Sequence, residues 1–288
     1  MIPAQFTYHA PTSVEDALHL LAELGDAGQD VKVLGGGQSL LPVLRLRLAA
    51  PEVVVDLGRI DSLRGVREDG DAIVIGAMTT HDTVTRDPLV RQHALLLALA
   101  SETVADPQVR HRGTFGGALV HADPAGDLLA PALALDAELV IAGPSGRRTV
   151  PAAEFFQDFF TTSVQEGELL VEVRVPRYTG WGAAYEKFSR VAQAWSVVAV
   201  AAAVRVEGGT IAEARVGLTN MGSVPIRARS VEQALVGKPA TADAIKTAAR
   251  SAGEGTSPPN DANGDEDYRR HLAGVLTGRA VLAAAGAS

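Results

Sequence analysis

The sequence contains no cysteine, and this absence narrows the chemistry that the chain can perform. Without thiols, the 288-residue chain forms no disulfide, offers no thiolate nucleophile and cannot ligate an iron–sulfur cluster by itself. Any redox chemistry would therefore depend on a bound cofactor.

Positive charge is also scarce. Lys and Arg number 26 against 34 Asp and Glu, which gives a net charge of −8 and disfavours contacts with phosphate backbones or anionic membranes. No uninterrupted apolar run approaches the roughly 20 residues of a membrane helix. The first residues lack the basic and apolar regions of a signal peptide. We therefore expect a cytoplasmic protein with no transmembrane segment and no nucleic-acid partner.

Familiar catalytic and metal-binding motifs are missing as well. There is no GxSxG or SxxK motif and no P-loop, and a Rossmann fingerprint would need a glycine where Leu40 stands. His111, His121 and Asp123 match no familiar closed metal site. We expect neither a catalytic side chain nor a metal ligand in this chain.

What the sequence does contain is two glycine-rich segments, GGGQSLLP at residues 35–42 and TFGGALVHADP at residues 114–124. Glycines have no Cβ, so several backbone N–H groups can converge on an anion without a lysine. A helix start near the second segment would add a favourable dipole. The two segments together predict one cofactor whose diphosphate is held from two sides.

The hydrophobic pattern predicts a protein of mixed helix and sheet. Of the residues, 47% are hydrophobic, enough for a sizeable core in two or three modest domains. A change of texture near residue 178 indicates a separate C-terminal domain with a β-hairpin connected through residues 207–210. The pattern predicts helices over residues 13–25, 88–101, 127–137 and 267–285, and strands over 31–34, 53–57, 73–77, 138–142, 169–175, 197–206 and 211–218.

Five segments together resemble one known family. Residues 36–42 and 112–124 resemble the two FAD signatures of the medium subunits of molybdenum hydroxylases, the carbon monoxide dehydrogenase and xanthine dehydrogenase superfamily. The resemblance extends through residues 75–81, 185–188 and 268–272 and covers nearly the whole chain. It implies an α+β fold with a non-Rossmann, PCMH-type FAD-binding region of two α/β subdomains, followed by a C-terminal domain with a small antiparallel sheet and helices. The expected boundaries are residues 1–56, 57–177 and 178–288.

The resemblance also implies which residues bind FAD. The glycine segments would contact the diphosphate, Asp127 the nucleotide portion, and Leu169 or Leu170 the flavin side. Lys187 falls near a family lysine, and Trp195 either stacks near the flavin or belongs to the core. Ala118 stands where many members have Ser or Asn, so that side-chain hydrogen bond is missing. The expected FAD-binding residues are Val33, Leu34, Gly35, Gly36, Gly37, Gln38, Ser39, Leu40, Val104, Thr114, Phe115, Gly116, Gly117, Ala118, Asp127, Leu169, Leu170, Lys187 and Trp195.

Family members work with a small subunit that holds two [2Fe-2S] clusters and a large subunit that carries the molybdenum cofactor. The resemblance therefore implies an FAD subunit, most like that of aerobic carbon monoxide dehydrogenase, in a dimer of heterotrimers. It would pass electrons from the clusters to an external acceptor. Alternatives are the medium subunit of a hydroxylase for an N-heteroaromatic compound, a purine or an aldehyde, a stand-alone flavin oxidase, and a non-enzymatic nucleotide-binding assembly protein.

Overall fold

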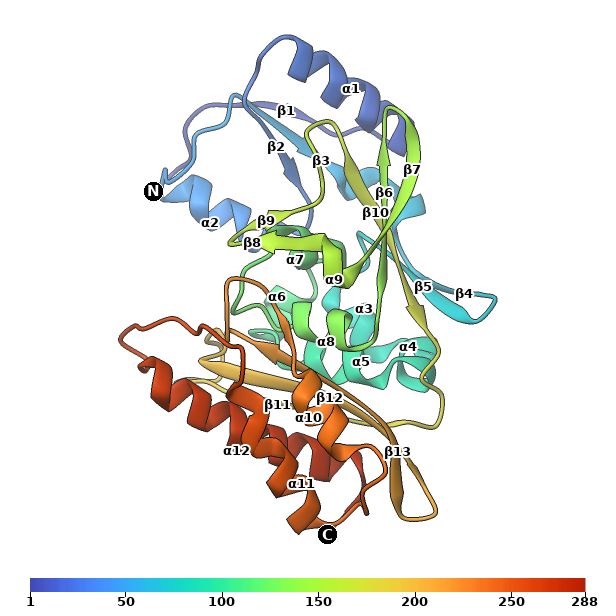
Figure 1. Ribbon diagram of the computed structural model, residues 1–288. Coiled ribbons are helices and arrows are strands. Elements are labelled where there is room, and N and C mark those ends of the chain that lie inside the picture. The colour runs from blue at the N-terminus through green and yellow to red at the C-terminus, as the bar shows by residue number, and fades with distance from the viewer. Residues whose placement is uncertain (288) are drawn as a thin grey trace.

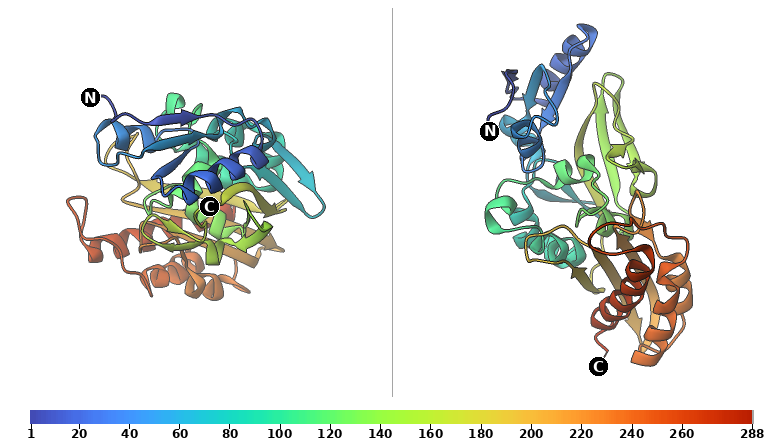
Figure 2. Two further views of the ribbon diagram at one scale, coloured as in Figure 1. Left: turned by 90° about the horizontal axis from the view of Figure 1, so that it is seen from above. Right: turned by 90° about the vertical axis from the view of Figure 1, so that its left-hand side faces the viewer.

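The computed structural model describes residues 1–287 and shows three regions that follow one another along the molecule (Figures 1 and 2). The N-terminal region lies at one end, a larger sheet with its helices lies in the middle, and the C-terminal sheet and helices lie at the other end. Each region has a sheet of its own. The mixture of helix and sheet confirms the predicted fold class.

The N-terminal region is a small parallel sheet in the order β1-β3-β2. Helix α1 begins after Ser13, whose side chain accepts a hydrogen bond from the Asp16 N–H, as the capping pattern predicts. The apolar side of α1 packs on β3 and also reaches the middle sheet through Leu169 and Val171. The elements of this region are β1 (Thr7–His9), α1 (Val14–Asp26), β2 (Val31–Leu34), α2 (Leu40–Arg45) and β3 (Val53–Asp56).

The middle region is an antiparallel sheet in the order β4-β5-β10-β6-β7, covered by short helices. Two 3₁₀ turns, Leu57–Arg59 and Asp61–Leu63, lead into it. Its strands are β4 (Val66–Asp69), β5 (Ala72–Gly76), β6 (Glu138–Gly143), β7 (Gly146–Pro151) and β10 (Leu169–Pro176), with a separate pair β8 (Phe156–Asp158) and β9 (Thr161–Thr162). Its helices are α3 (His81–Arg86), α4 (Pro88–His93), α5 (Leu95–Glu102), α6 (Pro107–Arg110), α7 (Phe115–His121), α8 (Leu129–Ala134) and α9 (Ala152–Phe155).

The C-terminal region is an antiparallel sheet in the order β11-β12-β13-β14, with helices on one face. Both faces of β12 are buried, because Ala201 and Ala203 pack against the middle region while Val200 and Ala202 pack against the helices. This explains the nearly continuous apolar run in that strand. The elements are β11 (Gly182–Phe188), β12 (Val198–Glu207), β13 (Thr210–Thr219), β14 (Ile226–Arg227), α10 (Arg229–Leu235), α11 (Ala242–Ala249), the 3₁₀ turn Arg250–Gly253, and α12 (Glu266–Ala284).

Three local predictions need correction. The helix predicted over 88–101 is interrupted at Ala94, where φ is −144° and ψ is 46°, so that α4 and α5 are separate helices. The helix predicted from 127 begins at Leu129. The second glycine segment, which lies outside the predicted helices, forms helix α7 over Phe115–His121. The β-hairpin prediction is confirmed, with only Gly208 and Gly209 between β12 and β13.

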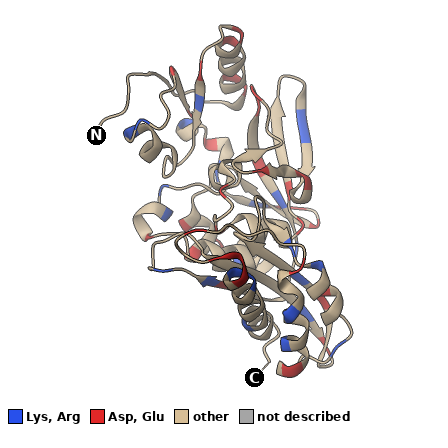
Figure 3. Cartoon of the chain, turned by 60° about the vertical axis from the view of Figure 1, so that its left-hand side comes forward, with Lys and Arg blue, Asp and Glu red and all other residues tan. Residues whose placement is uncertain are grey.

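Charges of both signs are scattered over all three regions (Figure 3). In residues 1–287, no helix is both long and apolar enough to cross a membrane.

Candidate functional site

A cavity of about 1170 Å³ lies where the three regions meet, and both glycine segments line it. Pockets for drug-sized ligands are about 300–1,000 Å³, so this cavity has room for a larger molecule. Every expected FAD-binding residue lines it except Leu34 and Phe115. The fold thus brings the predicted residues, which lie between positions 33 and 195 of the sequence, to one cavity.

The first glycine segment begins where β2 ends and leads into α2. Gly37 has φ of +76°, a conformation that glycine adopts without the steric cost of a side chain. Among the hydrogen bonds of residues 1–287, the N–H groups of Gly36, Gly37, Gln38 and Ser39 donate to no protein acceptor. Four neighbouring free donors that line one cavity are suited to an anion such as a diphosphate.

The second glycine segment has fewer free donors. The Phe115 N–H donates to the Thr79 carbonyl at 2.8 Å, and the Gly116 N–H donates to the Ala77 carbonyl at 2.9 Å. The Gly117 N–H faces the Thr114 hydroxyl at 3.3 Å. A Cβ on Gly116 would lie 2.6 Å from the Ala77 Cβ, so this glycine is required for close packing of α7. The segment therefore shapes the cavity more than it supplies N–H donors.

Phe115 and Leu34 do not line the cavity. The Phe115 side chain is fully buried in the core of the middle region, so the expected direct contact with FAD is corrected to a supporting role. Leu34 lies behind the first glycine segment, where its Cδ1 would be 3.3 Å from a Cβ on Gly37. Both residues pack behind the residues that line the cavity.

The two glycine segments touch each other directly. A Cβ on Gly35 would lie 3.0 Å from the Thr114 Oγ1, and a Cβ on Gly36 would lie 2.1 Å from the Arg112 carbonyl oxygen and 2.6 Å from the Gly113 Cα. The segments are therefore neighbours in the cavity wall, and the prediction that they hold one diphosphate from two sides stays a prediction. Their contact needs glycine because the two backbones approach too closely for any side chain.

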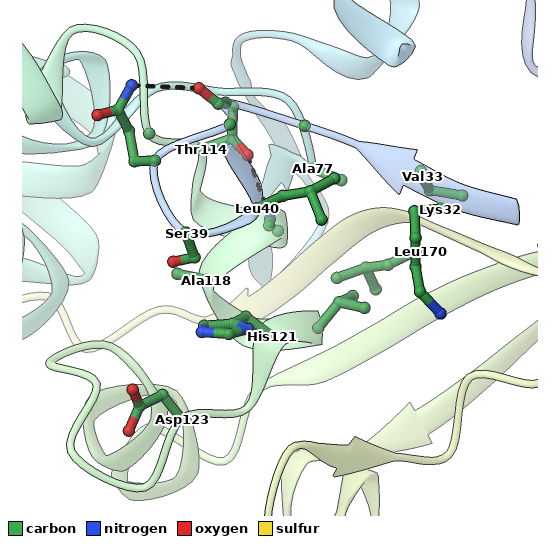
Figure 4. A pocket seen from close by; sticks show the side chains of 18 of the residues that line it. Lys32, Val33, Ser39, Leu40, Ala77, Thr114, Ala118, His121, Asp123 and Leu170 are labelled. Carbon is green, nitrogen blue, oxygen red and sulfur yellow. Dashed lines mark hydrogen bonds between the residues drawn. The ribbon is translucent and has the colours of Figure 1, made fainter. Parts of the chain in front are cut away.

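The cavity extends in two directions from the glycine segments. Figure 4 shows Lys32, Val33 and Leu170 together on one side, and His121 and Asp123 on the other. The first side, which we call the apolar arm, is formed by Val31, Val33, Leu169 and Leu170 with Lys32 at its edge. The second side, which we call the polar arm, is formed by Val104, His121, Asp127, Lys187 and Trp195.

Asp127 is the centre of a buried polar cluster in the polar arm. Its carboxylate accepts hydrogen bonds from Lys187 Nζ at 2.7 Å, from the Tyr185 hydroxyl at 2.9 Å and from the Ser196 hydroxyl at 2.9 Å. Lys187 also donates to the Thr103 carbonyl at 3.1 Å. Because Lys187, Tyr185 and Ser196 come from the C-terminal region, the cluster joins that region to the middle one.

Burial governs the ionisation of this cluster. Loss of water raises the pKa of Asp127, although the Lys187 ammonium and the hydrogen bonds act to lower it. Burial and the neighbouring Asp127 raise the pKa of Tyr185 well above its usual range, so that its hydroxyl remains a donor. The Lys187 Nζ is held in the cavity wall by its contacts with Asp127 and the Thr103 carbonyl.

Two histidines in the cavity wall were not predicted as site residues. Burial, with a smaller contribution from Arg110, lowers the pKa of His81 to about 4, and its Nδ1 has no hydrogen-bond partner. Burial also lowers the pKa of His121, whose ring lies 5.1 Å from that of Phe160. His81 belongs to the segment 75–81, which carried part of the family resemblance. This was the signal in the sequence that could have identified it as a site residue. Within residues 1–287, no three His, Cys, Asp or Glu residues are grouped to hold a metal ion.

Comparisons with known proteins agree over the whole chain. A family described as the FAD binding domain in molybdopterin dehydrogenase matches residues 4–178, and one described as the CO dehydrogenase flavoprotein C-terminal domain matches residues 183–284. The carbon monoxide dehydrogenase medium chain of Hydrogenophaga pseudoflava is 44% identical over 99% of this chain and 98% of that protein. The glyceraldehyde dehydrogenase medium chain of Sulfolobus acidocaldarius is 34% identical over 97% and 98%. A solved structure of the Hydrogenophaga enzyme, which lacks the Mo-pyranopterin moiety of its molybdenum cofactor, superposes with a TM-score of 0.94 at 45% identity, over 99% of this chain and 98% of that one.

Proposed function

Because this chain belongs to the FAD-binding medium subunits of the carbon monoxide dehydrogenase and molybdenum hydroxylase family, we propose that it is the electron-transfer subunit of such a complex. The observation that carries the proposal is the row of four free N–H groups from Gly36 to Ser39 in a cavity large enough for a dinucleotide. The residues present fit FAD, since the N–H groups of Gly36 to Ser39 that lack a protein acceptor all belong to residues that line this cavity. Bound FAD can take up electrons singly or in pairs, and the protein sets its position and polarity.

The two arms favour one orientation of the cofactor. We propose that the diphosphate lies on Gly36 to Ser39 and that the adenine end lies in the apolar arm, against Val33 and Leu170. The isoalloxazine ring would then be held in the polar arm, where Lys187, paired with Asp127, would favour negative charge on the ring. The family resemblance implies the other assignment, with Leu169 or Leu170 on the flavin side and Asp127 at the nucleotide portion, and the position of the ring in an FAD-bound structure distinguishes the two.

In this orientation, the residues of the chain have separate tasks. Asp127 keeps Lys187 in place, and the hydrogen bond from Ser196 keeps Asp127 in place. Trp195, which is 55% exposed, offers an aromatic surface at the edge of the polar arm. None of these side chains needs to act as a general acid or base for electron transfer.

We propose that the partners are a small subunit with [2Fe-2S] clusters and a large subunit with the molybdenum cofactor, arranged as a dimer of heterotrimers. The absence of cysteine supports this division, because the clusters require thiolate ligands from another chain. The higher identity to a carbon monoxide dehydrogenase medium chain favours that branch, while a relative named for glyceraldehyde marks the alternative of an aldehyde hydroxylase.

The proposal is tested by purifying the chain with its native partners and recording the visible spectrum. Flavin and iron–sulfur bands together with two co-purifying subunits are the expected result. Flavin bands alone would favour a stand-alone oxidase, and a colourless chain would favour an assembly protein. Reduction of the complex by carbon monoxide, compared with reduction by aldehydes, then identifies the branch.

A further inference from the structure

The segment that carries Trp195 has open space on both of its sides. Residues 189–197, which we call the Trp195 segment, connect β11 to β12. Ala194 and Trp195 line the large cavity and also a second cavity of about 520 Å³. Because cavities flank the segment, side-chain packing alone does not fix its position. Its conformation therefore depends on hydrogen bonds as well. Within the segment, Gln193 Nε2 donates to Asp106 Oδ2 at 3.2 Å and Arg190 Nη1 donates to Asn263 Oδ1 at 3.5 Å, and a second set of hydrogen bonds holds one end.

These hydrogen bonds lie at the end of the segment next to β12. The Val197 N–H donates to the Phe188 carbonyl at 2.8 Å and closes the segment. The Asn220 side-chain amide donates to the Ser196 carbonyl at 2.8 Å and to the Val197 carbonyl at 3.2 Å. The Val197 carbonyl also accepts a hydrogen bond of 2.5 Å from Arg269 Nη1.

Arg269 is the only arginine with a fully buried side chain among residues 1–287. A buried guanidinium is stable only when its N–H groups have partners. Besides the Val197 carbonyl, it donates to Asp261 Oδ1 at 2.7 Å and to the Gly264 carbonyl at 3.3 Å. It thereby ties helix α12 and the loop before it to the base of the Trp195 segment. Tyr268, in the sequence Tyr268–Leu272 that carried part of the family resemblance, also packs edge to face against Phe188 at the other end of the segment, with ring centroids 6.5 Å apart.

We propose that Arg269 is a positioning residue of the FAD site, acting from the C-terminal helix through the Trp195 segment. By holding the Val197 carbonyl, it places the Ser196 hydroxyl against Asp127, and Asp127 in turn holds Lys187 in the polar arm. The same hold keeps Trp195 at the edge of the cavity. The inference rests on the proposed function, because it assigns the effect to the flavin end of the cofactor.

The next residue provides a matched control. Arg270 lies on the same helix but points to its surface, where it pairs with Glu266 at 2.7 Å and donates to the Thr256 carbonyl at 3.3 Å. Arg270 makes no hydrogen bond to the Trp195 segment. Arg269→Lys and Arg270→Lys therefore make the same chemical change with and without a connection to the cavity. Lysine keeps the charge but loses the planar fork that reaches several acceptors at once.

The experiment compares the two variants as full-length chains by hydrogen–deuterium exchange of residues 189–197 and by FAD titration. We expect Arg269→Lys to speed exchange in the Trp195 segment of the apo chain and to weaken FAD binding roughly 10-fold, as for loss of a charged hydrogen bond. Arg270→Lys is expected to leave both unchanged. Ser196→Ala should weaken FAD binding by the same route, so the double variant Arg269→Lys/Ser196→Ala should lose less than the product of the two effects.

The proposal is overturned if Arg269→Lys exchanges and binds FAD like the wild type, if both arginine variants weaken binding equally, or if the Arg269 and Ser196 effects multiply independently. Should Arg269→Lys not fold, Asp261→Asn weakens the ion pair that orients the Arg269 guanidinium, and exchange in the Trp195 segment should again be faster. Unchanged exchange in Asp261→Asn would then overturn it. Failure of the wild type to bind FAD would contradict the proposed function, whereas exchange in the apo chain still reports whether Arg269 holds the segment.

Discussion

Replacing Gly36 by alanine tests the contact between the two glycine segments. The new Cβ would lie 2.1 Å from the Arg112 carbonyl oxygen and 2.6 Å from the Gly113 Cα, whereas ordinary contact begins at 3.4 Å. Both opposing atoms belong to the backbone, so no side-chain rotation relieves the collision. The first segment must therefore move away from the second by more than about 1 Å.

The size of the effect follows from what this displacement changes. Overpacking of this kind costs about 1–3 kcal/mol of folding free energy. Moving the Gly37, Gln38 and Ser39 N–H groups by about 1 Å breaks at least one hydrogen bond to a charged oxygen, which is worth about 1.5–3 kcal/mol. We therefore expect FAD to bind Gly36→Ala at least about 10-fold more weakly than the wild type, and about 100-fold if the larger value applies.

The assay is a titration of the apo chain with FAD, followed by the change in flavin fluorescence, together with thermal unfolding of the apo chain. Gly278→Ala is the control. Gly278 lies in helix α12, far from the cavity, and its new Cβ would be at an ordinary contact distance of 3.7 Å from the Ala249 Cβ in helix α11. This control should bind FAD normally. The reasoning is refuted if Gly36→Ala binds FAD like the wild type, or if FAD and FMN, which lacks the diphosphate bridge, lose affinity equally.

Three further predictions concern the cavity wall. Lys187→Met leaves Asp127 buried without its cation, so the free energy of unfolding at pH 7 should fall by about 3 kcal/mol. The double variant Lys187→Met/Asp127→Asn should lose less. Urea titration measures both losses, and equal losses would contradict the pairing. Burial lowers the pKa of His81 to about 4, so between pH 4 and 6.5 the unfolded chain binds a proton that the folded chain does not. The free energy of unfolding should therefore fall by up to about 3 kcal/mol when the pH is lowered through that window. His81→Gln should show a flatter pH dependence than the wild type. Gly116→Ala places a Cβ 2.6 Å from the Ala77 Cβ and 2.7 Å from the Ala77 carbonyl oxygen and should lower the melting temperature of the apo chain, a result that an unchanged melting curve would exclude.

Local features of the sequence predicted the first glycine segment well. A short apolar strand followed by three glycines specifies both the end of β2 and the free N–H groups, because glycine at φ of +76° needs no tertiary support. The second segment was less predictable. Glycine is a poor helix former, yet Gly116 and Gly117 lie in α7, because Thr114 caps the helix and Gly116 packs against Ala77. That contact joins residues about 40 positions apart and leaves no local pattern.

The polar cluster around Asp127 was even harder to predict from local sequence patterns. Asp127 and Lys187 were each predicted as site residues, but their ion pair depends on the docking of β11 against the middle region. Arg269 gave the sequence no sign of burial, because arginine on a helix is ordinarily exposed. Its three acceptors come from a loop and from the end of the Trp195 segment, which only the folded chain brings together. The positions of the site residues were therefore easier to predict from the sequence than the hydrogen-bond and ion-pair partners of those residues.

The most direct test of the account is a crystal structure of the chain loaded with FAD. The account predicts that diphosphate oxygens lie about 2.7–3.2 Å from the backbone nitrogens between Gly36 and Ser39. It also predicts that the isoalloxazine ring lies in the polar arm beside Lys187. A diphosphate elsewhere in the cavity, with these four N–H groups still without an acceptor, would contradict it.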